Sequence, residues 1–304
     1  MLNKTAAKRL AMICNLALLA TAMIFGLSFV AQKAGMEYVG PFTFNTLRFF
    51  IGSFSLFIVM LVGDKFNLFE GEKHCDKELG KGGVLAGLAL FVAYSINQIC
   101  MQFAEAGKAG FITSLYIVFV PIIYVFMKNK LKINVQIGVV LAIIGLYLLC
   151  ANGAMGFAWC DIGLLVAAFF FALHIIILGF FTKKVSATKL SCVQFLVAGI
   201  LSAPVMFFFE TPHISDIVAG IKPILFIGVV VTALGYTLQV FGQKAAKPVH
   251  ATMILSSESV FAVLGGILFL GETLNLREIC GCIVMIAAII ISQVPLKFLE
   301  RFQK

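Results

Sequence analysis

Charged residues are scarce in this sequence. Asp, Glu, Lys and Arg together make up 12% of the 304 residues, whereas an average soluble domain has about 25%. Hydrophobic residues make up 61%, and they form long runs rather than alternating with polar residues. Strands of a membrane barrel alternate over about 10 residues, but a membrane helix needs about 20 consecutive apolar residues. The composition therefore predicts an all-α membrane protein and excludes an ordinary soluble domain.

Reactive groupings of side chains are also missing. No Ser/His/Asp set, carboxylate pair or glycine-rich phosphate loop occurs where its chemistry could operate. Cys280 and Cys282 are two residues apart and point to different faces of a helix, which favours packing over metal binding. His74 and Cys75 lie together in a charged loop without a second pair of ligands. We therefore expect no enzyme activity, no cofactor and no metal site.

The net charge of +9 is typical of a nucleic-acid-binding domain only when the basic residues gather on a soluble face. Here they fall between the apolar runs. With the N-terminus inside, 18 of the 23 Lys and Arg face the cytoplasm, 4 lie in outer loops and Arg48 lies within a run. This asymmetry predicts a multi-pass protein of the inner or plasma membrane with both termini cytoplasmic, and no nucleic-acid partner.

Ten apolar runs of membrane-spanning length divide the chain. The first follows Lys4, Lys8 and Arg9 and continues to about residue 31, so we interpret it as an uncleaved span and not as a signal peptide. The runs lie near residues 10–31, 40–62, 82–104, 109–127, 132–151, 158–180, 187–209, 219–241, 249–270 and 275–295.

The two halves of the chain resemble each other. Phe25-Gly-Leu-Ser28 matches Phe171-Ala-Leu-His174 at an offset of 146 residues. At an offset of 141, Gly87, Gln98 and Gln102 match Gly228, Gln239 and Gln243. Because each half has five spans, an odd number, the second half begins on the opposite side of the membrane and is inverted relative to the first. We therefore predict two inverted five-helix repeats, 1–152 and 153–304, around a central cavity, as in alternating-access carriers.

Two motifs carry a family resemblance. Gly40-Pro-Phe-Thr-Phe-Asn-Thr-Leu-Arg48 opens the second span, and Ser256-x-Glu258-x-Val260-x-Ala262-x-x-Gly265 precedes Leu270-Gly-Glu272 in the ninth. With the duplicated unit, they make the chain similar to the EamA-type ten-span transporters of the drug/metabolite superfamily. The resemblance implies a secondary carrier with a cavity lined by both halves and the last helix of each half at the periphery. The family often has proline after the glutamate, where this chain has Ser259, so no proline kink is predicted there.

Glu258 is the principal candidate site residue. If its span enters the bilayer at Val249, Glu258 lies roughly 14 Å deep, about halfway through a hydrocarbon core of about 30 Å. An ionisable group at that depth is a functional candidate by default. Glu258 could couple protons to transport, bind a cationic or amine-bearing substrate, or accept structural hydrogen bonds. Ser256 is a weaker candidate because its hydroxyl can bond to its own helix backbone.

Polar side chains at spacings of three and four residues form one stripe on the third span and another on the eighth. We expect both stripes to line the cavity, although hydrogen bonds between helices are an alternative role. His174, in the sixth span, could relay protons or bind substrate, or it could be a buried neutral histidine. The stripes consist of Tyr94, Gln98 and Gln102, and of Tyr236, Gln239 and Gln243.

Two further features concern helix packing. Arg48 lies one or two turns from the outer face, where its side chain could extend to the membrane surface or join two helices. Gly138, Ala142 and Gly145 give the fifth span a face of small residues, which predicts close contact with another helix.

The sequence as a whole predicts a secondary active transporter. We expect export of small organic metabolites, amino acids or drugs by alternating access. Because no ATP-binding motif is present, transport must be downhill, by exchange or driven by an ion gradient, and Glu258 makes protons the candidate coupling ion. The expected partners are a small-molecule substrate and the lipid bilayer. A channel-like or facilitative permease without ion coupling, and a membrane receptor without transport, are the alternatives.

Overall fold

The computed structural model describes residues 4–65, 76–103, 106–150, 159–270 and 275–293, so Glu272, His74 and Cys75 lie outside the described residues. Within those ranges the chain is helical and contains no strand. The elements are α1 (Lys4–Met36), α2 (Pro41–Lys65), α3 (Asp76–Met101), α4 (Ala106–Ser114), α5 (Tyr116–Phe126), α6 (Ile133–Cys150), α7 (Trp159–Phe181), α8 (Ala187–Phe209), α9 (Ile214–Ala219), α10 (Ile221–Leu225), η1 (Phe226–Gly235), α11 (Tyr236–Gly242), α12 (Pro248–Leu255), α13 (Glu258–Leu270) and α14 (Leu276–Gln293).

Six stretches of helix in the described ranges are long and apolar enough to cross a membrane. They comprise residues 8–36, 41–62, 76–101, 159–181, 187–209 and 221–242. Shorter apolar helices cover residues 112–126, 133–148 and 279–292. Each of these coincides with a predicted run, which confirms an all-helical protein of membrane-spanning composition.

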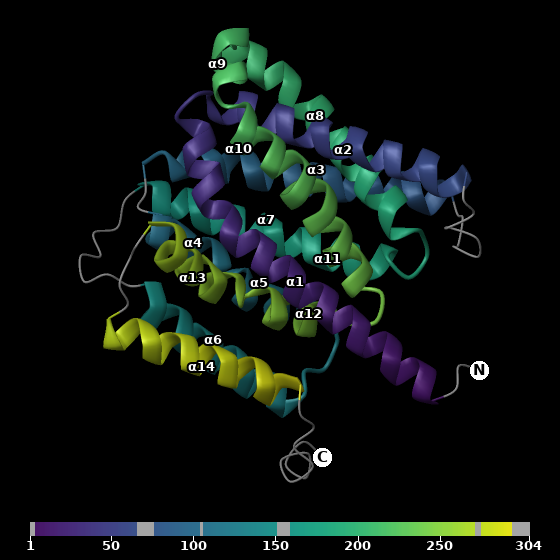
Figure 1. The fold of residues 1–304 in the computed structure, drawn as a ribbon. Coiled ribbons are helices and arrows are strands. Elements are labelled where there is room, and N and C mark those ends of the chain that lie inside the picture. Colours follow the sequence, from purple (N-terminus) through teal and green to yellow (C-terminus); the bar gives the residue numbers. More distant parts are fainter. Residues whose placement is uncertain (1–3, 66–75, 104–105, 151–158, 271–274, 294–304) are drawn as a thin grey trace.

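The helices pack in pairs along the bundle. In Figure 1, α1 crosses the front of the bundle, and α6 and α14 lie side by side along its lower edge. On the other side, α2 packs against α8, and α3 packs against both α7 and α8. A Cβ added at Gly145 would lie 2.9 Å from the backbone nitrogen of Met285 in α14. The small-residue face predicted for this stretch is therefore the contact between α6 and α14.

Two of the predicted spans are interrupted. Leu115 separates α4 from α5, and Ser256 and Ser257 separate α12 from α13. The hydroxyl of Ser256 donates to the carbonyl of Met253 at 2.8 Å, and that of Ser257 donates to the carbonyl of Ile254 at 2.6 Å. Such bonds to a carbonyl three residues back compete with the regular helix. The ninth run therefore breaks without a proline, just before Glu258.

A stretch of π-helix interrupts another predicted span. Residues 219–241 are expected as one helix, but η1 occupies ten residues between α10 and α11. It packs closely on α2: a Cβ at Gly52 would lie 2.6 Å from a side-chain methyl of Thr232, and one at Gly228 would lie 2.6 Å from Ile51. π-Helical segments are rare in proteins, and those that do occur often lie at functional sites.

The first helix, α1, packs closely on α13 at Gly26. A Cβ there would lie 2.4 Å from the carbonyl oxygen of Glu258 and 2.7 Å from the amide nitrogen of Ala262. Only glycine allows two backbones to come this near. Gly26 therefore fixes the start of α13, and with it Glu258, against α1.

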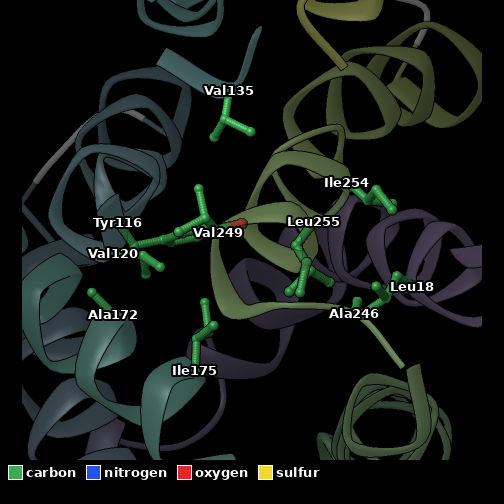
Figure 2. Packing of buried hydrophobic residues seen from close by; sticks show 11 residues of the cluster. Leu18, Tyr116, Val120, Val135, Ala172, Ile175, Ala246, Val249, Ile254 and Leu255 are labelled. Atoms are coloured by element: carbon green, nitrogen blue, oxygen red, sulfur yellow. The ribbon is translucent and has the colours of Figure 1, made fainter. Parts of the chain in front are cut away.

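Buried apolar side chains fill the space between α1, α5, α6, α7 and α12 (Figure 2). We name this group the Val249 cluster, after a residue near its centre. Its members are Leu18, Tyr116, Val120, Val135, Ala172, Ile175, Ala246, Val249, Ala251, Ile254 and Leu255.

Candidate binding cavity

A small cavity lies in the middle of the bundle, and residues from both halves of the chain line it. Its volume is about 60 Å³. One water molecule needs roughly 10–15 Å³ of such volume, so the cavity has room for a few waters, and a metabolite requires the helices to move apart. The lining consists of Phe25, Ser28, Phe29, Gln32, Tyr94, Asn97, Thr113, Tyr116, Phe171, His174, Ile175, Tyr236, Gln239, Leu255 and Glu258.

Glu258 lies in the wall of this cavity, at the first residue of α13. Its side chain is buried, and Oε1 accepts a hydrogen bond of 2.9 Å from the hydroxyl of Tyr116. The hydroxyl of Ser114 is 3.5 Å from the same oxygen and 3.1 Å from the hydroxyl of Ser259. In the part of the chain that the structure describes, these partners are neutral and no ion pair reaches Glu258. The carboxyl group is therefore held by hydroxyls that come from across the α4–α5 break.

Two tyrosines of the cavity wall join the halves of the chain. The hydroxyl oxygens of Tyr94 in α3 and Tyr236 in α11 are 2.5 Å apart. Aromatic rings surround the pair: the ring centroid of Phe25 is 4.7 Å from that of Tyr236, and the centroid of Phe171 is 5.0 Å from that of Tyr94. Since aromatic pairs prefer such tilted or edge-to-face contacts, the wall here is apolar with one polar bridge.

His174 also lines the cavity, but one of its ring nitrogens already has a partner. Its Nε2 is 3.0 Å from Oε1 of Gln194 in α8, and the side chain is buried. The imidazole ring lies edge-on to Tyr236, with centroids 5.8 Å apart. The histidine can therefore contact a solute through the cavity while α8 orients its ring.

Arg48 is fully buried, which rules out an extension of its side chain to the membrane surface. Its Nε donates to the hydroxyl of Thr232 at 3.2 Å, and Nη1 donates to Oε1 of Gln32 at 3.4 Å. The guanidinium carbon is 4.2 Å from the ring centroid of Tyr94, a cation–π contact. Nη2 is buried and has no hydrogen-bond partner among the described residues. Arg48 therefore lies directly behind two residues of the cavity wall, Gln32 and Tyr94.

The two polar stripes are only partly brought to the cavity. Tyr94, Tyr236 and Gln239 line it, and the buried Oε1 of Gln239 has no hydrogen-bond partner within the described part of the chain. Gln98 and Gln243 are buried outside the lining, and the residues that the structure describes offer no hydrogen-bond partner to their amide groups.

The remaining two candidate residues also lie elsewhere. Gln102 is exposed in the turn after α3. Ser256 points toward α14, where its hydroxyl is 3.7 Å from the sulfur of Met285.

Several lining residues are not singled out by the sequence. Thr113 and Tyr116 carry hydroxyls within a largely apolar run, as does Ser114, which contacts Glu258 without lining the cavity. This local departure from apolarity is the signal that could have identified all three. Asn97 lines the cavity next to Gln98 and donates to the hydroxyl of Thr113 at 2.9 Å. These contacts join α3, α4 and α5 around the carboxyl group of Glu258.

Comparison with known proteins points to one family. The model of the EamA-like transporter family matches residues 12–151 and again residues 158–293. An uncharacterized transporter of Archaeoglobus fulgidus is 32% identical over 91% of this chain and 84% of its own length. The uncharacterized transporter YoaV of Bacillus subtilis is 22% identical over 90% of this chain and 94% of its own length. The names of the relatives indicate a transporter rather than an enzyme.

A solved crystal structure shares the fold. It superposes with a TM-score of 0.76 over 96% of this chain and 98% of its own, at 15% sequence identity. The similarity at this identity concerns the fold alone. Together, the family match along most of the chain and the 32% identical relative establish that this multi-pass membrane protein belongs to the EamA-like transporter family.

Proposed function

We propose that the chain is a secondary carrier that moves a small organic solute through the central cavity by alternating access. The cavity supports this proposal because its lining comes from α1, α3, α4 and α5 of the first half and from α7, α11, α12 and α13 of the second half. A site between two halves is the usual place for the substrate of such a carrier.

The proposed architecture has ten spans in two inverted repeats, residues 1–152 and 153–304. Two matches to one family model, one in each half, support it. The helix breaks support it as well: Leu115 and Ser256 are 141 positions apart, the same offset that relates the two polar stripes. Discontinuous helices at corresponding positions of two halves are typical of carriers whose site lies between them. In this proposal the termini are cytoplasmic and the membrane is the inner or plasma membrane.

Glu258 is the proposed coupling residue, and its geometry is the single observation that carries this part of the proposal. It is a buried carboxyl group in the cavity wall, its hydrogen-bond partners are hydroxyls, and it follows directly on a helix break. A carboxyl group without a fixed counter-ion can gain and lose a proton as the cavity opens to one side and then the other. Proton antiport would then drive export of a metabolite, an amino acid or a drug.

Transport by proteoliposomes tests the proposal. The purified full-length protein is reconstituted, and the uptake of a panel of metabolites is measured with and without an imposed pH gradient. In antiport the proton and the solute move in opposite directions, so we expect a transported solute to accumulate in the acidic compartment. Glu258→Gln should abolish that accumulation while solute exchange at equal pH continues. Glu37→Gln, at an exposed carboxylate in the turn after α1, is the matched control.

The outcomes separate the alternatives. If uptake by the unaltered protein were the same with and without the pH gradient, the protein would be a facilitative permease. Currents faster than any carrier turnover would indicate a channel. Solute binding without any flux would indicate a receptor. An unchanged response to the gradient in Glu258→Gln would remove Glu258 from the coupling role.

A further inference from the structure

A second cavity lies at a different place in the fold, between the α5–α6 connection and the start of α12. Its volume is about 430 Å³, several times that of the central cavity. Of the described residues, none lines both this cavity and the central one. The lining consists of Tyr124, Lys130, Leu131, Lys132, Asn134, Val135, Lys247, Val249 and His250.

The charged residues that the structure describes in this lining are all basic. Lys130, Lys132 and Lys247 contribute three ammonium groups from two segments that are far apart in the sequence, and none of the described residues of the lining is Asp or Glu. Lys132 and Lys247 both lie near enough to His250 to interact electrostatically with its imidazole. A phosphate group bound among these side chains would interact favourably with each of the three ammonium groups.

The Val249 cluster separates the two cavities. Val135 and Val249 belong both to the cluster and to the second cavity, whereas Tyr116, Ile175 and Leu255 belong both to the cluster and to the central cavity. Figure 2 shows these side chains converging from α5, α6, α7 and α12. An anion bound among the lysines is therefore separated from Glu258 by a layer of packed apolar side chains.

We propose that the second cavity is a binding site for a phosphate group, supplied either by a free phosphate anion or by the headgroup of an anionic lipid. Lysine binds phosphate as a point charge that its flexible stem brings into place. The hydroxyl of Tyr124 and the imidazole of His250 add hydrogen-bonding groups to the same lining. The proposed topology places this cavity at the cytoplasmic face, where basic pockets between membrane helices bind anionic headgroups.

The test uses the full-length protein in nanodiscs of phosphatidylcholine. Thermal unfolding is followed while pyrophosphate is added, with sodium chloride of equal ionic strength as the reference. In a second arm, native mass spectrometry counts the phosphatidylglycerol molecules that remain bound in mixed nanodiscs. The variants are the triple substitution Lys130→Gln, Lys132→Gln and Lys247→Gln, and the same three positions changed to Arg. The matched control replaces Lys77, Lys81 and Lys183 with Gln, three exposed lysines outside the cavity.

We expect pyrophosphate to raise the unfolding temperature above the chloride reference, or one phosphatidylglycerol to remain bound. The Gln triple variant should weaken that binding by about tenfold or more, because three charge–charge attractions are lost. The Arg triple variant and the control should keep it, and Glu258→Gln should bind normally because the apolar cluster lies between. A response in the pyrophosphate arm alone identifies a free anion, and one in the lipid arm alone identifies a headgroup.

Two results would overturn the proposal. One is the absence of a response in both arms. The other is an equal loss of binding in the Gln triple variant and in the control triple variant, since that would show a general effect of surface charge. If the Gln triple variant does not fold, the Arg triple variant decides the question. An unfolding temperature in pyrophosphate no higher than in sodium chloride, together with no bound phosphatidylglycerol, would overturn the proposal.

Discussion

The hydroxyl of Tyr116 lies 2.9 Å from Oε1 of Glu258, and this contact joins two residues 142 positions apart in the sequence. Tyr116 is the first residue of α5 and Glu258 the first residue of α13, so the bond connects two helices directly after the break that precedes each of them. The carboxyl group in the cavity wall is thereby positioned by the opposite half of the chain.

Tyr116→Phe removes this donor and leaves Glu258 with the longer contact to Ser114. We expect a loss of about 1–3 kcal/mol in stability, the range for a hydrogen bond to a buried or charged group, and slower transport. Thermal unfolding and proteoliposome flux measure the two effects. Tyr147→Phe, at a tyrosine of α6 that is 48% exposed, is the control. Equal unfolding temperatures and equal transport rates of Tyr116→Phe and Tyr147→Phe would show that the bond does not position Glu258.

Gly26→Ala tests the close approach of α1 to α13. The new Cβ would lie 2.4 Å from the carbonyl oxygen of Glu258, and a backbone atom cannot move aside as a flexible side chain can. Overpacking of this kind costs roughly 1–3 kcal/mol. Gly80→Ala is the matched control, because nothing lies within 4 Å of its added Cβ and alanine favours a helix by about 1 kcal/mol. An unfolding temperature of Gly26→Ala at or above that of Gly80→Ala would contradict the prediction.

Arg48→Lys tests whether geometry or charge alone is needed behind the cavity wall. A lysine has no planar fork, so it cannot bond Thr232 and Gln32 at once while stacking on Tyr94. We expect a loss of roughly 1–3 kcal/mol from the broken buried hydrogen bonds, measured by thermal unfolding. Arg9→Lys, at an exposed position near the start of α1, should be neutral. Full stability of Arg48→Lys would show that a positive charge is sufficient at this position.

Glu210→Ala tests a link between α8 and α2. The Glu210 carboxylate accepts hydrogen bonds from the backbone amides of Phe42 at 2.8 Å and Thr43 at 2.7 Å. These are free donors in the first turn of α2, and a carboxylate is favourable at that end of a helix dipole. Removing it should cost about 1–2 kcal/mol in thermal unfolding. Glu37→Ala, which removes an exposed carboxylate a few residues before the start of α2, should leave the stability almost unchanged. A loss of stability as large as that of Glu210→Ala would show that the effect comes from the change in net charge and not from the hydrogen bonds to α2.

The long helices are predictable because membrane insertion depends on the length of an apolar run, which can be read directly from the sequence. The interruptions at Leu115 and at Ser256 and Ser257 are not. A serine inside an apolar run can bond back to its helix without ending it, and hydropathy averaged over a span does not register the difference. The number of spans and the inverted relation of the halves remain predictions.

The candidate site was predictable in part. The unusual cost of a carboxyl group in lipid singled out Glu258, which the structure places in the cavity wall. The spacing of polar residues indicated a polar face of α3, but it did not show which side of α3 lies toward the cavity. In the structure Asn97 lines the cavity and Gln98 does not. Tyr116 was missed because its role depends on a partner that only tertiary packing brings near. Its transport role and that of every other site residue remain proposals.

The π-helical stretch η1 has a mechanical consequence. Its hydrogen bonds connect residues five apart, whereas those of an α-helix connect residues four apart. A change of η1 to the α-helical pattern would therefore rotate α11 about the helix axis relative to α10. Tyr236 and Gln239, which belong to α11, would rotate with it. In the proposed transport cycle, such a rotation would separate the hydroxyl oxygens of Tyr94 and Tyr236, which are 2.5 Å apart in this structure.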